Sequence, residues 1–351
     1  MSRMKVTKLN CVKIRRTIYL LSIIVILAGA VGAILLFNNL YKNNTTKGVS
    51  YLYIPSNSQL NDLIDSLNSC KRVININTFN RAATIERFKN NVKPGRYKIV
   101  EGMNNRTLVR MFKLGLQTPL NLTISGNIRN LERLAAIISS RIESDSLSVL
   151  NILNDKKLSD SLGFDAFSFP GMFIQNTYQI YWTTKPRDLI LRLHREYNIF
   201  WNEDRRNQAM QIGLTPKEVT TLASIVNQES NLNQEHPIIA GVYINRIKNG
   251  IPLQADPTIK FALNDPTIKR ILYKHLEINS PYNTYKNRGL PPGPIVLPSP
   301  DVIDSVLNYS KHNYLYFCAK PSLDGSHSFA STLQQHNRNA RAYHNAIRGL
   351  K

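Results

Sequence analysis

The chain has 351 residues, of which 42% are hydrophobic, so it has room for about two globular domains besides any membrane segment. Its formal net charge of +22 indicates an acidic neighbour, such as nucleic acid, anionic lipid or an anionic polymer. The three cysteines, Cys11, Cys70 and Cys318, lie far apart and form no CxxC pair. This spacing argues against a disulfide framework and against a zinc site.

The N-terminus reads as a membrane anchor. Residues 1–17 carry six basic side chains and no acid, and the uncharged segment 18–37 is long enough to span a bilayer as a helix. The charge bias predicts a cytoplasmic N-terminus, a single span over residues 18–40 and an extracytoplasmic remainder. A cleaved signal peptide is the competing interpretation, but no clear cleavage site precedes Asn38. An anchored, exported chain is expected to contact the lipid bilayer through residues 18–37 and to bind no nucleic acid.

Residues 51–115 form a small α+β module after a short polar linker, 38–50. Strands are expected at 51–54 and 96–100, and helices after Ser58, over 78–90 and over 107–114, with Gly115 as the stop. Composition alone leaves open whether the module is a spacer or a binding module.

A second, mixed α+β domain is expected over residues 120–348. A strand over 120–124 precedes helices over 130–142, 146–154 and 186–201. The aromatic segment 164–181 is expected to be mainly core, with a platform for sugar rings as the alternative.

The segment from Thr215 to Asp256 is the centre of this domain. Thr215, Pro216 and Glu218 predict a helix start with a capping box. Glu229 lies seven residues after Leu222, on the flank of the apolar face of this helix. A partly desolvated carboxyl there has a raised pKa, as a general acid requires, whereas the alternative is an ordinary solvent-exposed glutamate.

The remaining elements surround this helix. A helix is expected over 236–247, and Asp256 is either the cap of the following helix or a site residue. The Pro- and Gly-rich segment 282–300 is expected to be an irregular loop that can wall a groove, before a helix from Ser299, a hairpin around Asp324–Gly325 and a basic C-terminal helix.

The candidate chemistry depends on one carboxyl. No phosphate-binding loop, dinucleotide fingerprint or GxSxG motif occurs, and the late histidines fit no metal motif. Ordinary glycoside hydrolysis needs two carboxyl groups, and only Glu229 has a persuasive position. One carboxyl suffices where the nucleophile is a hydroxyl of the substrate itself.

At these residues the sequence resembles the MltG-type endolytic murein transglycosylases, which carry a YceG-like domain. The matching segments are LASIVNQES, AGVYINRIKNGIPLQADPT, PYNTYKNRGLPPGPI and YLYFCAK followed by HSFAST. Asn227 stands where the family commonly has a glutamate, and PGMFIQNTY stands where the family reads EGYLFPDTY.

The resemblance implies a membrane-anchored lytic transglycosylase with a LysM-like module at 51–115 and a YceG-like catalytic domain at 120–348. Such an enzyme, a carbon–oxygen lyase, cleaves the β-1,4 bond between N-acetylmuramic acid and N-acetylglucosamine in nascent peptidoglycan. It leaves 1,6-anhydromuramic acid ends, which terminate strand elongation. It is expected at the inner membrane, with peptidoglycan strands as substrate and peptidoglycan synthases as candidate partners.

The resemblance also implies the site. Glu229 matches the catalytic glutamate of the family, and the motifs suggest substrate contacts at Asn245, Gln254, Asp256, Asn283 and Tyr285. No metal and no cofactor are expected. An inactive glycan tether and a hydrolase remain the alternative functions.

Overall fold

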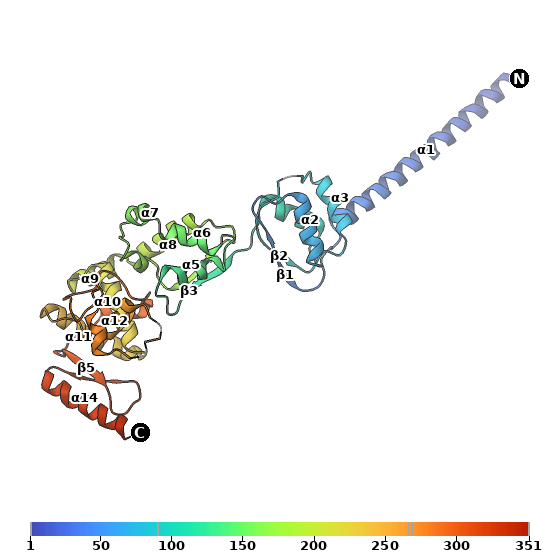
Figure 1. The fold of residues 1–351 in the computed structure, drawn as a ribbon. Helices are drawn as coiled ribbons and strands as arrows, with labels where there is room; N and C mark the ends of the chain where they lie inside the picture. Colours follow the sequence, from blue (N-terminus) through green and yellow to red (C-terminus); the bar gives the residue numbers. More distant parts are fainter. Residues whose placement is uncertain (1, 90, 266, 269, 350–351) are drawn as a thin grey trace. The chain divides into compact units, whose positions relative to one another are not determined.

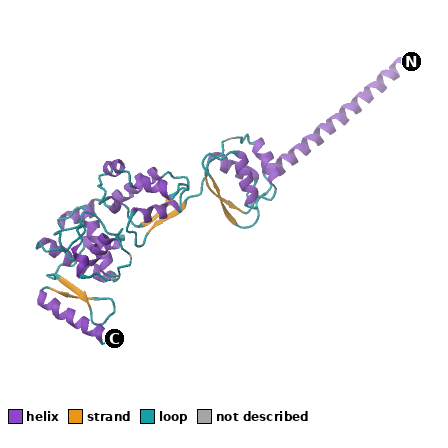
Figure 2. Cartoon of the chain, in the orientation of Figure 1, coloured by secondary structure: helices purple, strands orange, loops and turns teal. Residues whose placement is uncertain are grey.

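The computed structural model describes residues 2–89, 91–265, 267–268 and 270–349, with side chains described from residue 13. The chain divides into two compact units, residues 1–120 with 181–183, and residues 121–180 with 184–351. Helices dominate both units, and within the described residues three sheets form, each of two strands (Figures 1 and 2). The predicted α+β class is confirmed.

The first unit begins with α1 (Ser2–Leu40). Within it, residues 13–40 have a mean hydropathy of 2.9 in their most apolar stretch and are long enough to cross a membrane. The apolar side chains of residues 18–37 are exposed, whereas Leu40 belongs to the hydrophobic core of the unit. The long helix therefore continues directly into the folded module.

The module pairs β1 (Val49–Ile54) with β2 (Gly95–Val100) in an antiparallel sheet. Side chains alternate along β1, so that Leu52 and Ile54 point into the core. The helices are α2 (Leu60–Ser69), α3 (Ile76–Ile85) and α4 (Asn105–Leu114). Gly115 ends α4 with φ 70°, the left-handed conformation that glycine adopts most readily.

The prediction of a polar linker at 38–50 is wrong in one respect, because part of this segment is buried in the core of the unit. Asn44 is 4% exposed, and its amide exchanges hydrogen bonds with the backbone of Asn75 and donates to Asn105 Oδ1. Asn105 donates in turn to the Asn39 carbonyl at the end of α1. Buried amides with satisfied hydrogen bonds hold a segment in one place, so α1 and the module form one folded unit.

The second unit contains the remaining elements. Its strands are β3 (Leu120–Ile124), which pairs with β4 (Asn176–Ile180), and β5 (Tyr316–Ala319), which pairs antiparallel with β6 (His327–Ala330). Its α-helices are α5 (Leu131–Ser139), α6 (Ser146–Leu153), α7 (Lys156–Ser161), α8 (Pro186–Phe200), α9 (Glu203–Gln211), α10 (Pro216–Glu229), α11 (His236–Lys248), α12 (Asp256–Leu263), α13 (Pro300–Leu307) and α14 (Leu333–Arg348). Three short 3₁₀ turns are η1 (Phe169–Met172), η2 (Asn233–Glu235) and η3 (Tyr273–Glu277).

The predicted elements of this unit are present with small boundary shifts, while α7, α9 and β4 were not predicted. The aromatic segment 164–181 is mainly core, because Phe164, Phe169, Phe173 and Tyr178 are at most 4% exposed. Residues 282–300 contain no helix or strand before α13, as expected.

Helix α10 is buried around its whole circumference, not on the one face that its periodicity predicted. Residues 219–226 are all buried, including Thr220, Thr221 and Ser224. Each of these three hydroxyls donates to a backbone carbonyl of the preceding turn, at 2.7–2.9 Å. Hydroxyls that form hydrogen bonds within the helix can be buried with little loss of free energy. The polar residues of this helix therefore do not mark a solvent-exposed face. The capping box of Thr215 and Glu218 is confirmed.

Candidate active site

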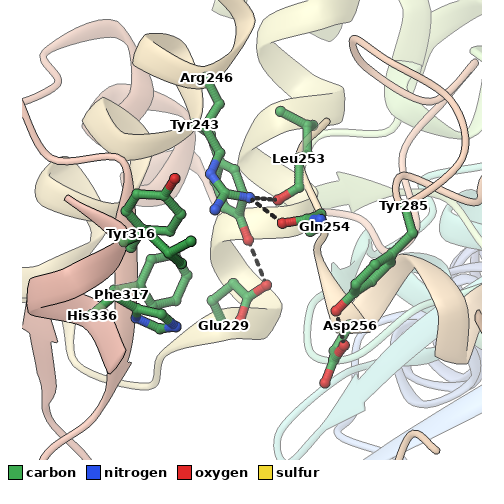
Figure 3. Close-up of a pocket in the computed structure, with 11 residues that line it drawn as sticks. Glu229, Tyr243, Arg246, Leu253, Gln254, Asp256, Tyr285, Tyr316, Phe317 and His336 are labelled. Atoms are coloured by element: carbon green, nitrogen blue, oxygen red, sulfur yellow. Dashed lines mark hydrogen bonds between the residues drawn. The ribbon is translucent and has the colours of Figure 1, made fainter. Parts of the chain in front are cut away.

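Glu229 is the last residue of α10 and lines a pocket of about 330 Å³ (Figure 3). The side chain is partly buried, and its Oε1 accepts a hydrogen bond of 2.7 Å from the hydroxyl of Tyr243 on α11. The carboxyl is therefore held in one position while the pocket remains open to a ligand.

The protonation of Glu229 is set by its surroundings. Loss of water around the carboxyl raises its pKa from the usual 4.5 to about 7, with the charge of Asp256 acting in the same direction. The Tyr243 hydrogen bond and the charges of Lys260 and Arg246 act in the opposite direction. The C-terminal end of a helix also disfavours a negative charge. The carboxyl can therefore give or take a proton near neutral pH, as acid–base catalysis requires.

Helix α11 places Tyr243 and Arg246 one turn apart on the same side of the pocket. Tyr243 is 2% exposed, and burial, with the adjacent Glu229 charge, raises its pKa well above the usual value, so it remains a neutral donor. Arg246 is 7% exposed and donates to the carbonyls of Leu315 (2.6 Å) and Leu253 (2.7 Å). The guanidinium thus places a positive charge at the pocket, while its own hydrogen bonds go to neutral acceptors.

The segment before α12 supplies Gln254 and Asp256. Gln254 has φ 53°, which is uncommon for a residue with a side chain and is a frequent feature of functional sites. The backbone N–H of Gln254 donates to the Thr284 carbonyl. Its side-chain Oε1 accepts a hydrogen bond of 3.3 Å from Arg246 Nη1. Asp256 makes no capping hydrogen bond at the start of α12; instead, its Oδ1 accepts a 2.6 Å bond from the Tyr285 hydroxyl. The interpretation of Asp256 as a helix cap is therefore wrong.

The structure brings four of the six predicted site residues to this pocket: Glu229, Gln254, Asp256 and Tyr285. Asn245 and Asn283 do not line it. The Asn245 side chain donates to the carbonyls of His312 and Tyr314. Asn283 is fully buried, where it donates to two backbone carbonyls and accepts from the Tyr285 amide. Both amides hold the loops behind the pocket in place.

The opposite wall comes from the C-terminal hairpin and α14, and our sequence reasoning did not predict it. Tyr316 and Phe317 on β5 and Leu333 and His336 on α14 line the pocket, with the His336 ring stacked on Tyr316. Tyr243 was missed as well, although its three-residue spacing from Arg246 on a helix was a usable signal. The wall residues lie 87 to 107 positions after Glu229 in the sequence, so no local spacing connects them with it.

A buried contact between the Glu235 carboxylate and the His327 ring attaches this wall to the end of α10. Glu235 is 6% exposed, and its carboxylate accepts from Ser230 Oγ at 3.0 Å and from the His327 backbone amide at 2.8 Å, with His327 Nδ1 2.7 Å away. Burial alone raises the pKa of Glu235, but these hydrogen bonds outweigh it and lower the pKa. Since Ser230 directly follows Glu229, the pair fixes the hairpin relative to the candidate acid.

Among the described residues, no group of three His, Cys, Asp or Glu side chains is arranged to hold a metal ion. The arrangement that is present consists of one protonatable carboxyl, a neutral phenol donor, a second carboxyl and aromatic walls. Such an arrangement is chemically suited to general acid–base catalysis, which makes this pocket the candidate active site.

Comparison with known proteins identifies the family. The YceG-like family model matches residues 52–342, and the chain belongs to this family. It is 29% identical, over 269 residues, to the endolytic murein transglycosylase of Bacillus subtilis, covering 71% of this chain and 72% of that protein. It is 36% identical, over 137 residues, to the endolytic murein transglycosylase of Streptococcus pneumoniae, covering 38% of this chain and a quarter of that longer protein.

A solved structure supports the same family. The crystal structure of a YceG-like protein from Listeria monocytogenes superposes with a TM-score of 0.56 and 26% identity. The match covers 83% of this chain and 98% of that chain.

Proposed function

We propose that the chain is a membrane-anchored endolytic murein transglycosylase. It cleaves the β-1,4 bond between N-acetylmuramic acid and N-acetylglucosamine in nascent peptidoglycan and leaves 1,6-anhydromuramic acid ends, which terminate strand elongation. The observation that carries the proposal is the Glu229 carboxyl, in a pocket, with a pKa of about 7. The names of the relatives give the substrate class.

In the first step, protonated Glu229 gives its proton to the glycosidic oxygen as the bond to the muramic acid C1 breaks. Positive charge then develops on the sugar ring, as in glycoside cleavage generally. Asp256 lines the same pocket and provides a negative charge that stabilises this transition state.

In the second step, the Glu229 carboxylate removes the proton from the muramic acid 6-hydroxyl, whose oxygen forms the new bond to C1. No water is consumed. The Tyr243 hydroxyl and the Arg246 charge favour the ionised form of Glu229 and so support this half of the cycle. The environment therefore balances burial, which favours the acid, against groups that favour the base.

The location follows from the anchor. A positively charged N-terminal tail before the apolar part of α1 favours a cytoplasmic N-terminus and an extracytoplasmic catalytic unit. Peptidoglycan lies on that side of the membrane, so the substrate and the proposed orientation agree. Synthases that extend the strands would work in the same compartment and are candidate partners.

The experiment that tests this function is mass spectrometry of the products from purified glycan strands. We expect muramic acid ends one water lighter than reducing ends. Glu229→Gln keeps the size of the side chain and its ability to accept from Tyr243, but it cannot transfer a proton, so activity should fall by about 10²–10⁴-fold. Near-normal activity in this variant would refute the role of Glu229.

A hydrolase is the second candidate, because Asp256 supplies a second carboxyl in the pocket. In that reaction Glu229 remains the acid and Asp256 is the base or nucleophile. Reducing ends that take up oxygen from labelled water would identify a hydrolase, whereas anhydro ends without label would identify the transglycosylase.

A further inference from the structure

A larger groove, of about 840 Å³, is lined by the segment before α5, the first turn of α5 and α12. Its main lining residues are Arg129, Asn130, Glu132, Lys260, Phe261 and Asn264. The groove combines two cations, Arg129 and Lys260, and two carboxylates, Glu132 and Asp265, with an aromatic side chain and amide groups, so the ligand it suits depends on which of these charges are free to meet one.

This flanking groove is adjacent to the Glu229 pocket along α12. Asp256 and Lys260 are four residues apart on this helix and therefore lie on the same face, Asp256 in the pocket and Lys260 in the groove. A second connection comes from Arg129, whose Nη2 donates a 2.8 Å bond to Gln228, the residue before Glu229. An extended polymer whose bond is cut at Glu229 can thus continue into the flanking groove.

The two cations of the groove have no carboxylate partner within 4 Å among the residues that the structure describes. Arg129 is held by neutral acceptors, Gln228 and Asn127. Of the nearby acids, Asp265 accepts bonds from its neighbour Thr267, and Glu132 forms no ion pair with either cation. An arginine positioned by neutral groups and an adjacent lysine can receive an external carboxylate.

We propose that the flanking groove is a second subsite for the strand, in which Arg129 and Lys260 bind a carboxylate of a muramic acid peptide stem. The proposal rests on the proposed function, since it assumes a peptidoglycan strand in the Glu229 pocket. The sugar rings of the strand carry no free carboxylate while the stem is attached, so the stems supply the negative charge. The enzyme would therefore distinguish strands with charged stems from strands whose stems are neutral.

The test measures binding rather than cleavage, with the full-length protein in detergent and the Glu229→Gln background to prevent turnover. Purified strands with free stem carboxylates are compared with the same strands after amidation of the carboxylates with methylamine. Amidation should weaken binding by the background protein. Lys260→Gln and Arg129→Gln should each weaken binding of the charged strands by about two- to five-fold, as expected for exposed charge pairs, and leave binding of the amidated strands almost unchanged.

Lys157→Gln is the matched control, because Lys157 is an exposed lysine of the same unit on α7, outside the groove. It should bind both strands like the background protein. The subsite is refuted if Lys260→Gln and Arg129→Gln leave binding unchanged, or if they weaken the binding of charged and amidated strands equally. It is also refuted if Lys157→Gln weakens the binding of charged strands as much as they do. Cleavage by the protein with Glu229 intact is measured separately. Charge-dependent binding without cleavage would refute the proposed function. Cleavage with binding that does not depend on the stem charge would refute the subsite.

Discussion

Glu229→Gln should stabilise the folded protein at alkaline pH, in addition to lowering its activity. Burial raises the pKa of Glu229 from 4.5 to about 7, so the folded state holds this proton more tightly than the unfolded state. Between these two pH values stability falls as pH rises, because the unfolded state ionises first. The difference corresponds to about 3 kcal/mol at about 1.4 kcal/mol per pKa unit. Glutamine does not ionise and escapes this loss.

The assay is denaturant unfolding of the full-length wild type and variant in detergent at pH 5 and pH 8. We expect the variant to gain about 2–3 kcal/mol in free energy of unfolding relative to wild type between these pH values. Glu101→Gln, which removes an exposed carboxyl of the first unit, is the control and should show no such change. An equal pH dependence for wild type and Glu229→Gln would show that the carboxyl is not desolvated and would contradict its role as the acid.

Other predictions follow from the contacts of the site. Tyr243→Phe removes the hydrogen bond that lowers the pKa of Glu229, so the alkaline limb of the pH–rate profile should move to higher pH; an unmoved limb would contradict this. Asp256→Asn should reduce product formation by about tenfold or more at an unchanged melting temperature, because the side chain does not cap α12; full activity would exclude an electrostatic role. Glu235→Gln should cost about 1–3 kcal/mol at neutral pH. Since the folded pKa of Glu235 is lowered, the contribution of its carboxylate is present above the unfolded pKa and is lost as pH falls through the folded pKa, which pH-dependent melting of wild type and variant would reveal. A reporter enzyme fused after Lys351 should be active only as an exported fusion, and cytosolic activity would overturn the proposed orientation.

The sequence alone determined the features that depend on neighbours along the chain. The apolar segment of α1, the capping box of Thr215 and Glu218, the stop at Gly115 and the hairpin around Asp324 are local patterns, and each is present in the structure. Motif resemblance indicated the family as well. Helical periodicity, at 100° per residue, also predicts Glu229 beside the apolar side chains of its helix, although the structure buries residues 219–226 on every side.

Only the tertiary structure decided the surroundings of Glu229. Tyr243 reaches the carboxyl because α11 packs against α10, and Phe317 reaches the pocket because its ring packs against Tyr243 of α11; no sequence spacing encodes either contact with Glu229. The same folding directs Asn283 into the core and decides between the two expectations for Asp256, which accepts a hydrogen bond from Tyr285 at the pocket and does not cap α12. Local preference can name the polar residues near a site, but a pKa depends on the water excluded and the charges brought close, and these are set by segments that meet only when the chain is folded.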